Sequence, residues 1–175
     1  MRWFRRRTAA PDLMAEAKAA CEGGDCGKAL SLWGPLAHAG VARAQNNIGA
    51  CFSEGLGVAR DAALALQWLT LAAAGGDPVG QRNLATASRQ GLGVEVNSAR
   101  AAALYREAAE QSDGPAQDML SFLLLEGDGV PADAAEARRW ALAAAENGIA
   151  AAMTRLGMMH HHVLGAPRDV ALAAH

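Results

Sequence analysis

Two glycines separated by one residue and followed by a valine occur three times in this chain, and glycine-rich stretches of this kind can bind phosphate. The stretches EGLGVARD, QGLGVEVN and EGDGVPAD contribute the glycine pairs Gly55 and Gly57, Gly91 and Gly93, and Gly127 and Gly129. Phosphate chemistry would require a preceding strand, together with a Gly-Lys-Ser/Thr ending or a third glycine. None of the three stretches has this context. We therefore interpret each as a turn between helices, whose first glycine ends a helix in the left-handed conformation.

The stretch MHHHV, residues 159–163, is the segment that most resembles a metal site. Two histidines bind one metal from a helix best at positions i and i+4, whereas neighbouring side chains point about 100° apart. We expect His160 to be packed in the interior, and His161 and His162 to be more exposed. The chain also offers no serine, cysteine and histidine that a repeat would bring into a triad. The sequence thus predicts no metal, no cofactor and no catalytic residues, so that the protein is not an enzyme.

The composition favours an all-helical protein with no affinity for nucleic acid. Of 175 residues, 51% are hydrophobic and only 5% aromatic, and alanine dominates the apolar share. Alanine is the best helix former and a poor strand former. The net charge of −2 provides no general attraction to nucleic acid.

The first residues, MRWFRRR, are strongly basic and allow two interpretations. Residues 1–11 could be a disordered tail, or residues 2–7 could contact a membrane surface, as in an envelope-associated regulatory protein. No apolar run follows the arginines as in a secretory signal, and no stretch is long enough to span a membrane. We therefore expect a cytoplasmic protein.

The chain has three cysteines, Cys21, Cys26 and Cys51, at irregular spacing. An odd number without a regular spacing favours reduced, buried thiols in a reducing compartment. A bond between Cys21 and Cys26 stays open as the alternative.

A repeat of 36 residues runs through the chain. The first glycines of the three turns are 36 residues apart, and other positions recur at the same interval; we call each such set a column. Four columns are Ala29, Ala65, Ala101 and Ala137; Ala37, Ala73, Ala109 and Ala145; Leu32, Trp68, Leu104 and Trp140; and Ile48, Leu84, Leu120 and Leu156. Asp61, Asn97, Asp133 and Asp169 form a fifth, at positions suited to cap a helix.

Each repeat contains two helices. About a dozen helix-forming residues follow each capping residue, as in AALALQWLTLAAA at residues 62–74. The other helix begins near GDP, residues 76–78, or DGP, residues 113–115, where aspartate caps and proline fits the first turn. It ends at the glycine turn.

The segment AQNNIGACFSEGLGVARDAALALQWLTLAAAGGD, residues 44–77, resembles a Sel1-like repeat, a 36-residue relative of the tetratricopeptide repeat. The resemblance covers residues 12–175, as a partial unit 12–43, units 44–79, 80–115 and 116–151, and a truncated unit 152–175. It implies an all-α, right-handed solenoid of stacked antiparallel helix pairs. It also implies a non-catalytic scaffold or adaptor for protein–protein interaction, of a kind often found in bacteria.

Such a solenoid presents a concave groove lined by the first helix of each pair. If the tetratricopeptide geometry holds, the groove residues that contact a protein or peptide are Asn46, Asn47, Arg82, Asn83, Asp118 and Phe122. The asparagine amides can donate to and accept from a peptide backbone, and Phe122 could anchor it. Alternatively these are ordinary solvated residues, with Phe122 in the core.

The sequence stops after seven residues of a second helix, 169–175. Solenoids usually cover their last apolar face with a polar capping element. We therefore expect that the chain either is a fragment of a longer array or self-associates at this C-terminal end.

Overall fold

The structure is a computed structural model that describes residues 12–161, in which every regular element is an α-helix. The elements are α1 (Leu13–Glu22), α2 (Cys26–His38), α3 (Ala42–Glu54), α4 (Ala62–Ala74), α5 (Pro78–Gln90), α6 (Ser98–Glu110), α7 (Gly114–Glu126), α8 (Ala134–Glu146) and α9 (Ala150–His161). The predicted all-α solenoid of stacked helix pairs is confirmed. The predicted basic tail, membrane contact, C-terminal end and His162 lie outside the described residues, and so do the side chains of His160 and His161.

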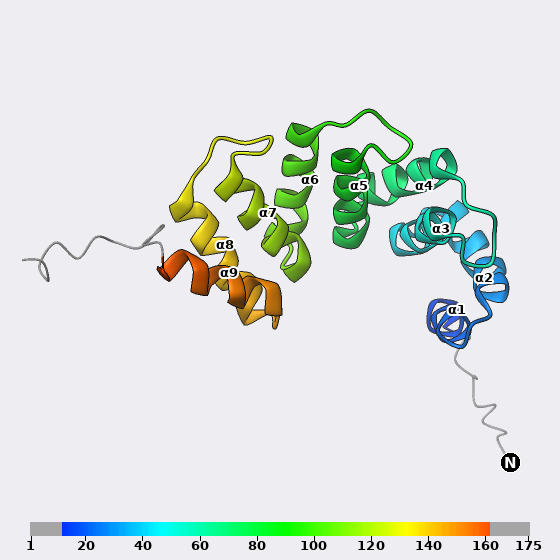
Figure 1. Cartoon of the computed structure of the whole chain (residues 1–175). Helices are drawn as coiled ribbons and strands as arrows, with labels where there is room; N and C mark the ends of the chain where they lie inside the picture. Colours follow the sequence, from blue (N-terminus) through cyan, green and yellow to red (C-terminus); the bar gives the residue numbers. More distant parts are fainter. Residues whose placement is uncertain (1–11, 162–175) are drawn as a thin grey trace, which may run out of the picture.

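The helices are stacked along an arch, with α1 and α9 at its two ends (Figure 1). Each helix packs against the next in sequence, and α3 also contacts α5 directly. A stack is curved toward the helices that lie closest together, so the odd-numbered helices form its inner, concave side.

Polar side chains cap the even-numbered helices where the sequence predicts helix starts. The carboxylates of Asp61 and Asp133 each accept the backbone N–H three residues ahead at 2.9 Å, and the amide oxygen of Asn97 does so at 2.8 Å. Asp77 and Asp113 cap α5 and α7 in the same way. These bonds satisfy donors that the first turn of a helix leaves free.

Each glycine turn locks one helix pair onto the preceding pair. The first glycines, Gly55, Gly91 and Gly127, have φ values of 78°, 73° and 71° and end α3, α5 and α7. The second glycines, Gly57, Gly93 and Gly129, lie directly against the first residues of α2, α4 and α6, namely Cys26, Ala62 and Ser98. A Cβ at Gly93 would lie 2.6 Å from the carbonyl oxygen of Ala62. The second position therefore requires glycine for close approach as well as for its backbone conformation.

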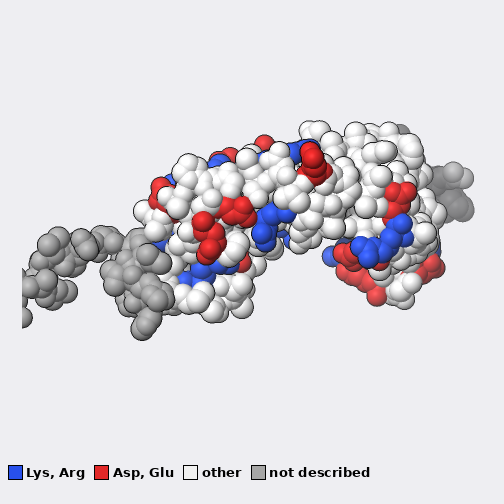
Figure 2. Space-filling model, turned by 45° about the horizontal axis from the view of Figure 1, so that its top comes forward, with Lys and Arg blue, Asp and Glu red and all other residues white. Residues whose placement is uncertain are grey.

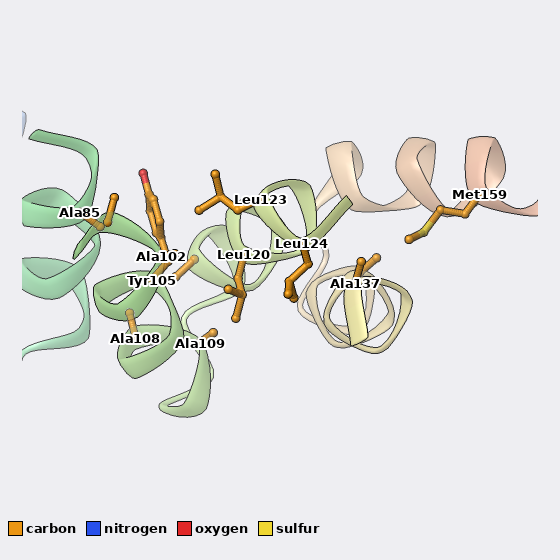
Figure 3. Packing of buried hydrophobic residues seen from close by; sticks show 13 residues of the cluster. Ala85, Ala102, Tyr105, Ala108, Ala109, Leu120, Leu123, Leu124, Ala137 and Met159 are labelled. Carbon is orange, nitrogen blue, oxygen red and sulfur yellow. The ribbon is translucent and has the colours of Figure 1, made fainter. Parts of the chain in front are cut away.

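The buried core follows the stack as three clusters, which form where neighbouring helix pairs cover each other's apolar faces. Leu120, Leu123 and Leu124 of α7 lie between Tyr105 of α6 and Ala137 of α8 (Figure 3). The alanine columns are buried except at Ala145, which is half-buried, and their small side chains allow adjacent helices to approach closely.

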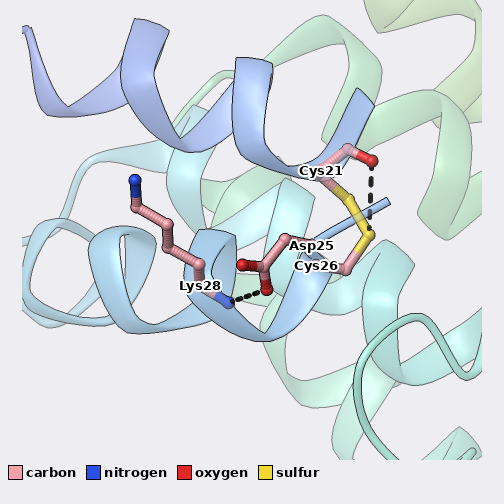
Figure 4. The surroundings of a disulfide bond; sticks show 4 residues. All are labelled: Cys21, Asp25, Cys26 and Lys28. Atoms are coloured by element: carbon pink, nitrogen blue, oxygen red, sulfur yellow. Dashed lines mark hydrogen bonds between the residues drawn. A yellow bond between two sulfur atoms is a disulfide. The ribbon is translucent and has the colours of Figure 1, made fainter. Parts of the chain in front are cut away.

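A disulfide joins Cys21, in the last turn of α1, to Cys26, the first residue of α2 (Figure 4). The expectation of three reduced thiols is therefore wrong for this pair, because the short α1–α2 turn brings the two residues together. The Cys26 sulfur also lies 3.7 Å from the carbonyl oxygen of Cys21. An oxidised sulfur has no hydrogen to donate, so this is a packing contact in the disulfide form. Cys51 keeps a buried free thiol, whose pKa is raised by burial and by Glu54.

Candidate partner-binding groove

The predicted groove residues lie on three successive concave helices, α3, α5 and α7. Asn46, Asn47 and Asn83 come together at the α3–α5 contact, whereas Arg82, Asp118 and Phe122 enter other interactions. Asn46 is buried, and Asn47 and Asn83 are half-buried.

The three asparagines form a continuous chain of hydrogen bonds. Asn83 Nδ2 donates to Asn46 Oδ1 at 2.8 Å, and Asn46 Nδ2 donates to Asn47 Oδ1 at 3.3 Å. The Nδ2 hydrogens of Asn47 and the side-chain oxygen of Asn83 then remain for other partners. Reversing all three amides preserves the chain and exchanges the two ends, so in either direction one end donates and the other accepts. The backbone of a bound peptide carries N–H donors and C=O acceptors, and the two ends of the amide chain offer a partner for each.

The charged groove residues are ion-paired between neighbouring units. Arg155 Nε lies 3.2 Å from Asp118 Oδ1, and the two residues are separated by the same 37 positions as Asn46 and Asn83. Arg82 Nε lies 3.0 Å from Asp113 Oδ1 without hydrogen-bond alignment. These pairs hold concave helices together and are less available to a partner than the amides.

Phe122 is half-buried and flanked by two guanidinium groups. The central carbons of Arg89 and Arg155 lie 5.8 and 5.3 Å from its ring centroid, within the range of cation–π attraction. Phe122 also packs against the core that contains Leu120 and Leu123. It is thus already sandwiched within the protein, and its predicted role as an anchor stays a prediction.

Two hollows open along the N-terminal half of the groove and are related by the repeat. The first has a volume of about 410 Å³ between α1 and α3, and the second about 140 Å³ between α3 and α5. Their equivalent lining residues are Met14 and Ala50, Trp33 and Leu69, Asn47 and Asn83, Ala50 and Thr86, Cys51 and Ala87, and Leu56 and Leu92. The amide chain thus runs along hollows wide enough for side chains.

The prediction missed a column of buried glutamines beside the asparagines: Gln45, Gln81 and Gln117. Gln45 Nε2 donates to the carbonyl oxygen of Ala37 at 3.0 Å, and Gln117 Nε2 to that of Ala109 at 3.1 Å. Both carbonyls lie near the end of the preceding helix, where the last turn leaves acceptors free. An identical polar residue every 36 positions was the signal in the sequence.

Charge is mixed over the molecule, and Figure 2 shows acidic and basic side chains interspersed on the face in view. On the even-numbered helices, Arg106 donates to Glu136 and lowers the pKa of that carboxyl group. The same bond raises the pKa of Arg106. This pair links α6 to α8 and is structural.

Among the side chains that the structure describes, residues 12–159, no group of three or more His, Cys, Asp or Glu could hold a metal ion. In the same part of the chain, no helix has both the length and the apolar character needed to cross a membrane.

The model of the Sel1 repeat family matches four consecutive segments, residues 42–77, 78–113, 114–149 and 150–175. These segments agree with the 36-residue spacing of the glycine turns. A comparison with curated proteins gave no match.

Solved structures with Sel1 repeats are similar over most of the chain. A Sel1 repeat protein from Oxalobacter formigenes is 29% identical, with a TM-score of 0.82 over 89% of this chain and 64% of its own. A protective antigen present in uropathogenic Escherichia coli strains, which displays an SLR fold, is 30% identical, with a TM-score of 0.77 over 92% of this chain and 39% of its own. The present chain is thus shorter than either protein and spans less than two thirds of each.

Proposed function

Since this chain belongs to the Sel1 repeat family, whose helix-pair arrays are generally protein–protein interaction scaffolds, we propose that it binds a protein segment or peptide in its concave groove, without catalysis. Both similar structures come from bacteria, which supports a bacterial origin. The observation that carries the proposal is the hydrogen-bonded chain of Asn46, Asn47 and Asn83. Its two ends offer a donor and an acceptor to an extended backbone.

The surroundings of this chain suit an extended segment. The hollows lie on both sides of Ala50, so a bound segment could place side chains in them while its peptide groups meet the amides. Side chains on one face of an extended segment alternate with those on the other, so every second residue would enter the groove. Since the ion pairs of the groove are internally matched, we expect shape and hydrogen bonding to decide affinity more than net charge.

The test is binding of peptides selected by display of random sequences on the full chain. Asn47→Ala and Asn83→Ala should each weaken binding by about 5- to 10-fold, the value of a lost hydrogen bond. Thr70→Ala removes an exposed hydroxyl from α4, away from the groove, and should leave the affinity unchanged. Unchanged affinity in both asparagine variants would refute the groove assignment.

A further inference from the structure

The hollow between α1 and α3, which we call the N-terminal pocket, contains an unmatched hydrogen-bond donor. Its lining includes Met14, Trp33, Asn47, Ala50, Cys51 and Leu56. Trp33 is only 4% exposed, and its indole Nε1 has no hydrogen-bond partner within residues 12–161. A buried donor without an acceptor typically costs about 1–3 kcal/mol. Trp33 lines the hollow, but the Nε1 atom itself is covered, so an oxygen atom of a bound segment reaches it only after a neighbouring side chain moves aside.

The equivalent position in a later repeat unit shows which hydrogen bond such an oxygen would accept. Tyr105 occupies the same column as Trp33, two units along the chain, and its hydroxyl lies 2.8 Å from Thr86 Oγ1. Thr86 uses its own hydrogen to donate to the carbonyl oxygen of Arg82 at 3.0 Å, so Tyr105 is the donor in this pair. At the place of Thr86 on α1 stands Met14, which packs against the cluster that contains Trp33. Its thioether is a weak acceptor on a flexible stem.

The column of Met14 also explains why the groove is open at this end. Its members are Met14, Ala50, Thr86 and Phe122 on successive concave helices, and the first three line the two hollows. Phe122 occupies that place in the third unit, between Arg89 and Arg155. Ala50 has only a methyl group where Phe122 has an aromatic ring, so space for a ring remains beside Ala50.

We infer that the N-terminal pocket is the anchor site for a tyrosine side chain of the bound segment, whose hydroxyl oxygen accepts a hydrogen bond from Trp33 Nε1. The ring fills the apolar space beside Ala50 and Cys51, and the unbranched side chain of Met14 can shift to admit it. The volume of about 410 Å³ is within the range of ligand sites. The rim does not select by charge, because Lys18 is paired with Glu22 and Arg43 with Asp77. This inference rests on the proposed function and specifies its anchor.

The test uses pools of synthetic seven-residue peptides, random except for a fixed central tyrosine, phenylalanine, leucine or alanine, applied to the immobilised full chain. The tyrosine pool should bind most strongly, about 5-fold above the phenylalanine pool, because only tyrosine satisfies the indole donor. Trp33→Phe keeps a ring but removes the donor, so the two aromatic pools should bind it equally.

Ala50→Phe should reduce binding of the tyrosine pool at least tenfold by filling the pocket, as Phe122 does in its own unit. Thr70→Phe, at an exposed position of α4, is the matched control for added bulk and should bind normally. Ala50→Leu gives a second, smaller filling variant in case the phenylalanine variant loses helicity.

Two results would overturn the anchor site: equal binding of all four pools by the unaltered chain, or normal binding of the tyrosine pool by a folded Ala50→Phe variant. If binding in these cases still falls on Asn47→Ala, the groove proposal stands without the anchor. If neither Asn47→Ala nor Ala50→Phe changes binding, or if no pool binds at all, both the groove and the anchor are refuted.

Discussion

At the scale of single residues, the second glycine of each turn combines two requirements that are usually separate. Gly93 has a φ of 72°, and its Cα faces the backbone of Ala62 with no room for a methyl group. Gly76 has a similar φ of 78° but has no heavy atom within 4 Å of a built Cβ. The two positions therefore separate the cost of backbone conformation from the cost of crowding.

Gly93→Ala should lower the free energy of unfolding by about 2–4 kcal/mol, since overpacking adds about 1–3 kcal/mol to the conformational cost. Gly76→Ala should lose only the conformational part, about 1 kcal/mol. Urea unfolding of both variants measures the difference. Equal losses would contradict the close contact between the turn and α4.

Glu136 makes one part of stability dependent on pH. Because Arg106 lowers the pKa of the folded carboxyl group, its contribution is complete above the pKa of the unfolded state, about 4.3, and is lost as the pH falls through the folded pKa. Glu136→Gln should lower the melting temperature at pH 7, and the gap to the unaltered protein should narrow as the pH falls below about 4. Glu146→Gln, an exposed change on the same helix, is the control. A gap that persists unchanged at pH 3 would contradict the pairing.

At the scale of elements, the helices and their ends could be predicted because local chemistry determines them. Asp61, Asn97 and Asp133 are strong caps wherever they precede a helix, and Gly55 ends α3 in the predicted way. The groove was less predictable, because the same column holds asparagine, arginine or aspartate in successive units. Whether such a residue bonds to a neighbour or stays available depends on the next unit, as the pair of Asp118 and Arg155 shows.

The disulfide acts on the terminal pair of helices. Reduction should lower the exchange protection of α1 amides and leave α5 to α8 unchanged, because units of a solenoid contact only their neighbours. Hydrogen–deuterium exchange with and without a reductant measures this, with a Cys21→Ala, Cys26→Ala double variant as the reference for the reduced state. An equal loss of protection in α1 and α7 would contradict local action of the bond.

At the scale of the whole molecule, units that share structural columns but differ at groove positions build a groove that is uneven along its length. The structural columns, such as Ala29 to Ala137, are repeated without change, so the backbone geometry is regular. The groove is open near α1 and α3 and occupied by Phe122 near α7. A partner should therefore dock at the N-terminal half.

The most direct measurement of this claim is an amide and side-chain NMR footprint of the full chain with a peptide selected by display. We predict that the shifted signals include the Trp33 indole N–H and the side-chain amides of Asn47 and Asn83, whereas signals of α6 and α8 stay in place. A footprint centred on the even-numbered helices, or one that leaves α3 and α5 untouched, would contradict the concave groove as the binding surface.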